Sequence, residues 1–235
     1  MAFIPENHFS SWWSKLIKKD PNIDSENSFE NNLKNTIKKV LNEYSKKDIQ
    51  VFPQASKLFR AFRETSFENC KYILVGQDPY HNVYNNSPSA CGLSFVTENN
   101  YLNPSLRVLM ESLEMNSKDP NIFKEFMLGQ GVLLLNMSLT VERGKANSHT
   151  ELWQEFTDEL VQLIYLANPK IEWILLGSKA REVAGILAQR YADDKELPAP
   201  IVHVAPHPAY YSYKKIKDYK ALKLLWKQLK WLKTL

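Results

Sequence analysis

The stretch Tyr72-Ile73-Leu74-Val75-Gly76-Gln77-Asp78-Pro79-Tyr80-His81 decides the fold class of this chain. It opens with a run of apolar residues and ends in a glycine that is followed by polar residues and a proline. Short apolar runs of the same kind recur at residues 132–135, 174–176 and 201–204. Because these runs are apolar, with His203 in the last of them as the exception, they predict strands that are buried on both faces, as in parallel sheets.

Helical patterns lie between and before these strands. Apolar residues recur at helical spacing in residues 29–44, 106–115, 152–167, 180–191 and 216–232. Strands that alternate with helices predict an α/β fold, here a four-stranded parallel sheet flanked by helices on both faces in a three-layer sandwich. We expect a single domain over residues 1–235, with an N-terminal helical part at about residues 1–50.

The bulk composition limits the class of protein. The chain has 235 residues, 44% of them hydrophobic, and a net charge of +4, so it can form one large core and permits nucleic-acid binding without indicating it. Two cysteines, Cys70 and Cys91, cannot build a disulfide framework and suit a reducing compartment. No apolar stretch is long enough to span a membrane. We therefore expect a monomer without membrane contact that is intracellular, and cytoplasmic if the source is prokaryotic.

Polar residues follow each of the four predicted strands. They are Gln77 and Asp78 after the first strand, Asn136 after the second, Gly177-Ser178 after the third and His207 after the fourth. Because ligands of parallel sheets bind at the carboxyl ends of the strands, we expect these four clusters to meet in one cleft.

Three of these side chains suit chemistry, although each has a plainer explanation. Asp78, held in a turn by Pro79, could orient a water or stabilise a developing cation, or could simply belong to the turn. The Asn136 amide offers one acceptor and two donors to a ligand, or could bond the nearby backbone. His207 could be an acid, a neutral donor, a metal ligand or a packed side chain. No third metal ligand accompanies His203 and His207, so we expect no metal.

Two further positions are open in the same way. Gly177-Ser178 could bind a phosphate at the start of a helix, or Ser178 could merely cap that helix. Phe95 could stack on a base or pack in the core. The lysine-rich segment at residues 214–233 is interpreted as a core helix with a solvated face rather than a membrane helix.

The first motif, Gly76-Gln77-Asp78-Pro79-Tyr80-His81, resembles the water-activating motif of family 1 uracil-DNA glycosylases. Other segments are similar to that family in the same order: Gly92-Leu93-Ser94-Phe95, Leu133-Leu134-Leu135-Asn136, Leu139-Thr140-Val141, Ala146-Asn147-Ser148-His149, Leu176-Gly177-Ser178 and His207-Pro208. The resemblance covers about residues 50–235, while the N-terminal helices match only loosely.

The resemblance implies a monofunctional DNA-repair hydrolase that flips uracil out of single- or double-stranded DNA and hydrolyses its N-glycosidic bond. It makes Asp78 and His207 catalytic, and it assigns uracil binding to Gln77, Asp78, Tyr80, Phe95, Asn136 and His207. In that assignment Tyr80 excludes the methyl group of thymine. The implied DNA contacts are Ser105, Gly177, Ser178, Tyr210, Tyr211 and Ser212. The family implies no metal or organic cofactor, and it makes inhibitor proteins that mimic DNA possible partners.

The chain departs from the family on its DNA-handling side. The segment Asn82–Cys91 is longer than is usual there, and Cys91 replaces a histidine. The strand-compressing loop is reduced to Asn103-Pro104-Ser105. In the loop after His207, Tyr211 stands where the family has an intercalating leucine, and Tyr210 is the competing candidate for this wedge. Two rival hypotheses remain at this point: a non-catalytic paralogue that binds uracil or single-stranded DNA, and a glycosylase for another damaged base.

Overall fold

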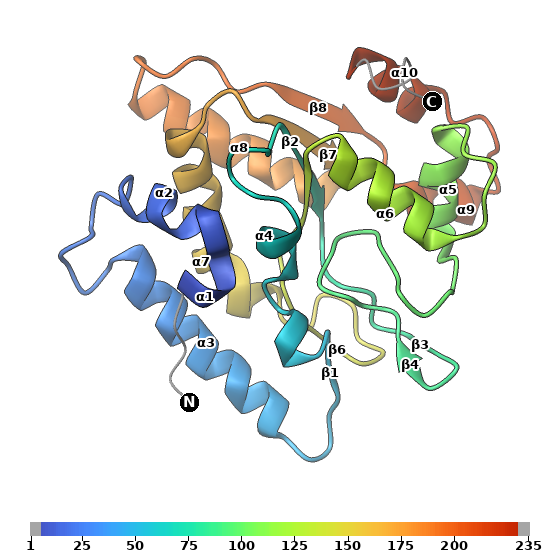
Figure 1. Cartoon of the computed structure of the whole chain (residues 1–235), viewed down its shortest axis with the longest axis horizontal. Coiled ribbons are helices and arrows are strands. Elements are labelled where there is room, and N and C mark those ends of the chain that lie inside the picture. The colour runs from blue at the N-terminus through green and yellow to red at the C-terminus, as the bar shows by residue number, and fades with distance from the viewer. Residues whose placement is uncertain (1–5, 230–235) are drawn as a thin grey trace.

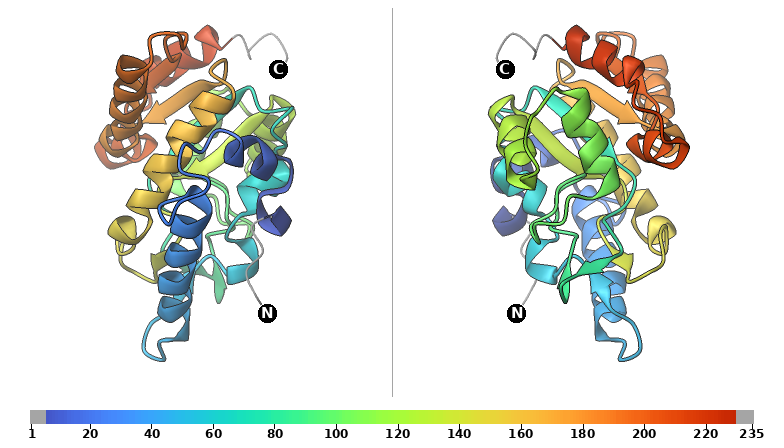
Figure 2. Two further views of the ribbon diagram at one scale, coloured as in Figure 1. Left: turned by 90° about the vertical axis from the view of Figure 1, so that its left-hand side faces the viewer. Right: turned by 90° about the vertical axis from the view of Figure 1, so that its right-hand side faces the viewer.

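A four-stranded sheet forms the centre of the computed structural model, which describes residues 6–229 (Figure 1). Its strands are β2 (Tyr72–Gly76), β5 (Val132–Asn136), β7 (Glu172–Leu176) and β8 (Val202–Ala205). They lie in the order β5-β2-β7-β8, and all three neighbouring pairs are parallel. Helices cover both faces, as the two side views in Figure 2 show, which confirms the predicted three-layer α/β fold.

The remaining elements connect and cover these strands. The helices are α1 (Glu6–Phe9), α2 (Trp13–Ile17), α3 (Phe29–Ser45), α4 (Arg60–Glu64), α5 (Pro104–Ser112), α6 (Pro120–Gly129), α7 (Thr150–Ala167), α8 (Ser178–Asp193), α9 (Pro208–Lys214) and α10 (Lys220–Gln228). Two 3-10 turns are η1 (Ser10–Trp12) and η2 (Ala55–Lys57). Two small antiparallel pairs are β1 (Val51–Phe52) with β6 (Val141–Glu142), and β3 (Val83–Tyr84) with β4 (Ser87–Pro88).

Three of the four strands, β2, β5 and β7, form where the sequence is apolar and are covered on both faces, as predicted. The prediction is wrong for β8, an edge strand that contains His203 and in which Val204 is 44% exposed. Ile73, Leu74 and Val75 of β2 are fully buried, and β5 is buried along its whole length. The register pairs Gly76 with Asn136 at the carboxyl end of these two strands. The residues after the strands therefore emerge together at one edge of the sheet.

The N-terminal helices belong to the same hydrophobic core as the sheet. Phe9, Trp12 and Phe29 are fully buried. The indole Nε1 of Trp12 donates to the carbonyl of Thr65 at 2.7 Å, and the hydroxyl of Thr65 donates to the carbonyl of Val132 in β5 at 2.9 Å. The expected helical part is observed at residues 6–17 and 29–45. Because residues 1–5 and 230–235 are not described, the single-domain boundary stays a prediction.

Two helices were not expected from the sequence. Helix α6 begins at Pro120 after Asp119, whose carboxylate accepts from the N–H of Asn121. The segment after His207, which we expected to be a loop, is helix α9. The last predicted helix starts at Lys220 rather than at residue 216, and residues 230–232 of that prediction lie outside the described range. No helix within residues 6–229 is long and apolar enough to cross a membrane.

Candidate active site

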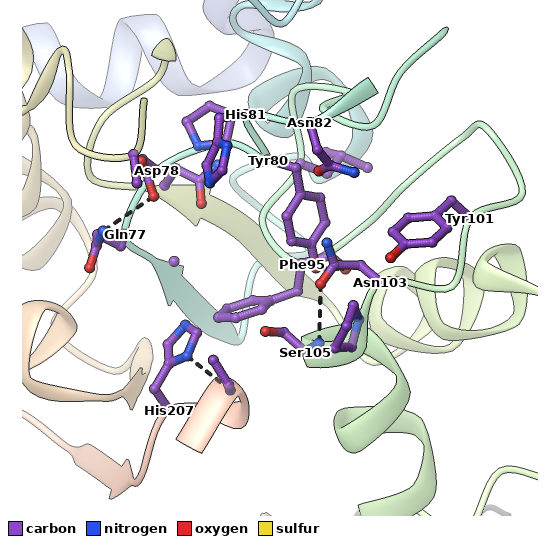
Figure 3. Close-up of a pocket in the computed structure, with 17 residues that line it drawn as sticks. Gln77, Asp78, Tyr80, His81, Asn82, Phe95, Tyr101, Asn103, Ser105 and His207 are labelled. Carbon is purple, nitrogen blue, oxygen red and sulfur yellow. Dashed lines mark hydrogen bonds between the residues drawn. The ribbon is translucent and has the colours of Figure 1, made fainter. Parts of the chain in front are cut away.

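Three of the four strand ends, those of β2, β5 and β8, meet in a pocket of about 670 Å³. The expected fourth cluster, Gly177-Ser178 after β7, does not line this pocket. The pocket contains every residue that the sequence assigned to uracil binding, together with Ser105: the lining includes Gln77, Asp78, Tyr80, Phe95, Ser105, Asn136 and His207 (Figure 3). The expectation that polar clusters from the strands meet in one cleft is therefore confirmed for Asp78, Asn136 and His207.

The Asp78 carboxylate is held by a distant turn. Its Oδ2 accepts from the backbone N–H of Asn147 at 2.8 Å, and its Oδ1 accepts from Nε2 of Gln77 at 3.3 Å. The Gln77 side chain also donates to Oδ1 of Asn147. Asn147 has a φ of +63°, a conformation that asparagine tolerates better than most residues. The two bonds restrict the rotation of the carboxylate and fix its position at the pocket wall.

His207 is fixed in one protonation pattern by the helix that follows it. It is the N-cap of α9, and its Nδ1 accepts from the backbone N–H of Ala209 at 3.1 Å. Burial lowers the pKa of His207, while Asp78 acts in the opposite direction. A neutral imidazole whose Nδ1 accepts must carry its proton on Nε2. The Nε2–H is therefore available to donate to a ligand in the pocket.

Asn136 presents a buried amide to the same pocket. The residue is 6% exposed, and within residues 6–229 its side chain has no hydrogen-bond partner. The neighbouring strand makes room for it, because a Cβ at Gly76 would lie 2.2 Å from Oδ1 of Asn136. The described buried side-chain atoms that lack a hydrogen-bond partner do not include those of Asn136, so its amide is open to the pocket, where it can offer one acceptor and two donors to a ligand.

Two aromatic residues form the remaining walls. The hydroxyl of Tyr80 donates to the carbonyl of Phe95 at 3.1 Å, and burial raises the pKa of Tyr80, so the hydroxyl stays protonated. Phe95 has a φ of +61°, and its ring lies 5.7 Å from the ring of His207. A planar ligand that reaches Asn136 would lie beside these rings.

The residues expected to contact DNA lie at different distances from the pocket. Ser105 lines it, and its backbone N–H is capped by Oδ1 of Asn103 at 3.1 Å. Ser178 is exposed at the start of α8. Gly177 instead adjoins His207: with a φ of +91°, it would place a Cβ only 2.7 Å from the Cβ of His207.

The structure corrects the expected wedge residue. Tyr211 is 5% exposed and packs edge-on against Tyr219, with ring centroids 5.6 Å apart. As placed, its ring belongs to the core and cannot enter a duplex. Helical geometry turns the preceding side chain outward instead, and Tyr210 is 49% exposed. Ser212 is partly buried, and its hydroxyl donates to the carbonyl of Pro104 at 3.1 Å, which joins α9 to α5.

Sequence reasoning did not single out several residues of the site. Asn147 appeared only as part of a motif shared with the family. Its contact to Asp78 uses the backbone N–H, which every residue except proline has, so the residue type does not indicate this contact. Asn82 and Tyr101 also line the pocket. Within the described part of the chain, no cluster of three or more histidine, cysteine, aspartate or glutamate side chains suits a metal ion.

Comparison with known proteins adds a family to this geometry. The model of a family described as the Uracil DNA glycosylase superfamily matches residues 62–232. A protein of Francisella philomiragia named uracil-DNA glycosylase is 37% identical over 159 residues, covering 64% of this chain and 71% of the relative. One of Mesomycoplasma hyopneumoniae with the same name is 40% identical over 151 residues, covering 62% and 65%.

Solved structures share the fold at lower identity. A variant of mimivirus UNG in complex with UGI has a TM-score of 0.65 and 20% identity, with 88% of this chain and 70% of that chain covered. The wild-type UNG of Nitratifractor salsuginis has a TM-score of 0.60 and 22% identity, with 95% and 96% covered. At this identity the likeness concerns the fold alone.

Proposed function

The chain belongs to the uracil-DNA glycosylase superfamily, and from that premise we propose how its pocket releases uracil from DNA. The enzyme is a hydrolase of base excision repair that acts on the N-glycosidic bond of uracil flipped out of DNA and leaves an abasic site. One observation carries the assignment of roles: a fixed carboxylate, a neutral histidine with a free Nε2–H and an unpartnered amide line the same pocket.

Asp78 and His207 act on opposite charges of the transition state. As the bond to uracil stretches, positive charge develops on the sugar and negative charge on the base. The Asp78 carboxylate stabilises the sugar and orients the water whose hydroxyl adds to C1′. The Nε2–H of His207 donates to O2 of the departing uracil. The proton of the water ends on the released base, so the net reaction is the hydrolysis of one C–N bond.

Asn136 and Tyr80 select the base. The Asn136 amide accepts from N3–H of uracil and donates to O4, whereas cytosine presents the reverse pattern. Tyr80 fills the space beside C5 and excludes the methyl group of thymine. Phe95 stacks on the base, and the backbone of Gln77 borders it. These contacts satisfy the amide that the protein leaves without a partner.

The DNA contacts follow from the rim of the pocket. We assign phosphate contacts to Ser105, Ser178 and Ser212 and to the backbone of Gly177, and the wedge to Tyr210. Binding of DNA-mimicking inhibitor proteins is supported by the mimivirus relative that was solved with UGI. A monomeric state is part of the same proposal. Two free, buried cysteines, Cys70 and Cys91, support an intracellular location.

The test is uracil release from oligonucleotides that carry a single uracil, read as strand cleavage after alkali. Wild-type protein should cleave single- and double-stranded uracil substrates and spare the thymine and cytosine controls. Asp78→Asn should bind these substrates nearly as well and release uracil about 10²–10⁴-fold more slowly. Release at the wild-type rate by that variant would remove Asp78 from the mechanism.

Base choice has its own test. Asn136→Asp should lose activity on uracil and gain weak activity on cytosine, since a protonated carboxyl group can accept from N4 and donate to N3. Tyr80→Ala should admit some thymine. An unchanged preference for uracil in both variants would place the base elsewhere.

A further inference from the structure

The inserted segment at residues 82–91 builds a separate hairpin (Figure 1), and Asn82 at its start lines the pocket. Strands β3 and β4 pair in the register Val83 to Pro88 and Tyr84 to Ser87. The turn between them is Asn85-Asn86, with φ values of +48° and +58°. Two successive left-handed residues make a tight hairpin turn, so the insertion is an ordered structure.

The base of the hairpin is fixed to the pocket wall. Asn82, which lines the pocket, donates to the hydroxyl of Ser89 at 3.0 Å, and the N–H of Ser89 donates to the carbonyl of Asn82 at 3.1 Å. Asn99 donates to the carbonyl of Ser87 at 3.0 Å and to the hydroxyl of Ser89 at 3.1 Å. The side chain of Val83 packs on a small buried cluster. These contacts anchor the base of the hairpin next to the pocket.

Strand alternation then turns Tyr84 outward, onto Tyr101. The two rings are stacked, with centroids 4.8 Å apart and an interplanar angle of 28°. Tyr84 is 39% exposed, so ring surface that Tyr101 does not cover is open to solvent. Tyr101 itself lines the pocket, on the same side as Tyr80 and Asn82 (Figure 3). Aromatic surface therefore runs without a break from the pocket wall to the outside of the hairpin.

Two hydrogen bonds hold the backbone of Tyr101 in place. Its backbone N–H donates to Oδ1 of Asn99 at 3.3 Å, and its carbonyl accepts from the hydroxyl of Thr97 at 2.7 Å. Asn99 therefore holds both partners of the stack, the hairpin and Tyr101. Two rings that already stack on each other lose less side-chain entropy when a third ring is added than two separate rings would.

We propose that the Tyr84–Tyr101 stack is a platform for the base of a nucleotide next to the flipped uracil in single-stranded DNA. This inference rests on the proposed function, because the platform continues the wall of the uracil pocket. The hairpin from Asn82 to Ser89 has no charged residue, so it offers no ionic contact to a phosphate. Its exposed aromatic ring offers stacking, which accepts any base. In a duplex that neighbouring base is already stacked, so the platform acts on single strands.

The experiment compares Tyr84→Ala with Tyr84→Phe on single-stranded and duplex substrates that carry one uracil. Tyr84→Ala should lower kcat/KM on single strands by about 5- to 150-fold, the range that follows from removing a stacking aromatic, and should change it much less on duplex. Tyr84→Phe should stay close to wild type, because the ring remains. Tyr191→Ala is the matched control: this tyrosine lies near the far end of α8 and contacts Lys195.

A second arm identifies the base. Replacing the nucleotide on one side of uracil with an abasic analogue should lower kcat/KM of the wild-type protein on single strands. On that substrate wild type and Tyr84→Ala should have the same kcat/KM. Analogues on both sides should be tested in turn. If Tyr84→Ala loses the same factor on substrates with and without the neighbouring base, or equally on single strands and duplex, the platform does not exist.

Binding separates this inference from the proposed function. In an Asp78→Asn background the affinity for intact single strands can be measured by fluorescence anisotropy, and adding Tyr84→Ala should reduce it by the same factor. If wild type fails to release uracil, the proposed function falls, while the anisotropy still decides on the platform. If release is normal and neither kcat/KM nor affinity changes with Tyr84→Ala, only the platform falls.

Discussion

The backbone N–H of Asn147 donates to Oδ2 of Asp78 over 2.8 Å, although the two residues are 69 positions apart in the chain. This bond makes the position of the Asp78 carboxylate depend on a turn in which Asn147 has a φ of +63°. The turn therefore supports the pocket wall, and Ala146 beside Asn147 lines the same pocket.

Substitutions at Asn147 should reveal that support. Asn147→Gly keeps the N–H and accepts the left-handed conformation, so it should lower kcat by less than about tenfold, through the lost bond to Gln77. Asn147→Val is strained there by about 1–3 kcal/mol, which should displace the N–H and lower kcat at least tenfold further with little change in KM. Single-turnover release measures both, and equal rates in the two variants would contradict a positioning role.

His207→Asn separates two roles of the histidine. Asparagine is a good N-cap, so its side chain should replace Nδ1 as the acceptor for Ala209 and preserve α9. It is too short to present a donor where Nε2–H lies, so kcat should fall about 10²–10³-fold, the cost of one oxyanion donor. Circular dichroism should show an unchanged fold. Near-wild-type turnover would exclude His207 as the donor to O2.

The same variant should alter the pH dependence of stability. Burial lowers the pKa of His207 from its usual 6.5, so below that pH the unfolded chain binds a proton more readily than the folded one. The stabilisation is complete above about pH 6.5 and is lost as the pH falls through the lowered pKa. Urea unfolding at several pH values should therefore show a shallower acid loss for His207→Asn. An identical slope in both proteins would mean that His207 is not desolvated.

Gly177→Ala tests the close approach to His207. The added Cβ would lie 2.7 Å from the Cβ of His207, at a φ of +91° that alanine rarely adopts, so the histidine must shift. We expect kcat to fall about tenfold or more, since a small misplacement of a catalytic group is costly. Gly185→Ala in the same helix meets nothing within 4 Å and is the control; it should be fully active and slightly more stable. Equal activity of the two variants would refute the steric argument.

Of the three tyrosines of α9, Tyr210 and Tyr211 should respond differently to substitution. Tyr211→Ala empties a core position and should destabilise the protein by about 3–5 kcal/mol, slowing release from all substrates at elevated temperature. Tyr210→Ala should leave the melting temperature unchanged and slow release from duplex more than from single strands, where no stack is interrupted. Tyr210→Leu should recover part of that loss. The reverse pattern would return the wedge to Tyr211.

The central strands could be predicted because their residue types indicate that they are buried. Runs such as Ile73-Leu74-Val75 have no polar residue that could face water, so the parallel strands before Asp78 and Asn136 follow from hydrophobicity. The strand before His207 carries a weaker signal, because it contains His203 and lies at the partly exposed edge of the sheet. Helix α9 was not predictable in this way. Its N-cap is a histidine, which is not a common cap, and its tyrosines are modest helix formers.

The error about Tyr211 has a related cause. In an irregular loop two adjacent side chains have no fixed directions, whereas in a helix they point about 100° apart. Once α9 forms, its packing against α5 and Tyr219 decides which tyrosine is buried. The contact between Asn147 and Asp78 was hidden for another reason, since it uses a backbone group that nearly every residue carries.

The two hydrogen bonds that connect Trp12 to Thr65 and Thr65 to β5 limit which changes the N-terminal segment can tolerate. The family match begins at residue 62, yet Thr65 already depends on the indole of Trp12 for its buried carbonyl. Deleting the first helices would leave that carbonyl without a partner and expose the rings of Phe9 and Phe29. The N-terminal segment can therefore tolerate many substitutions, provided that it keeps an apolar face for the core and one hydrogen-bond donor for the carbonyl of Thr65. Its deletion would destabilise the fold.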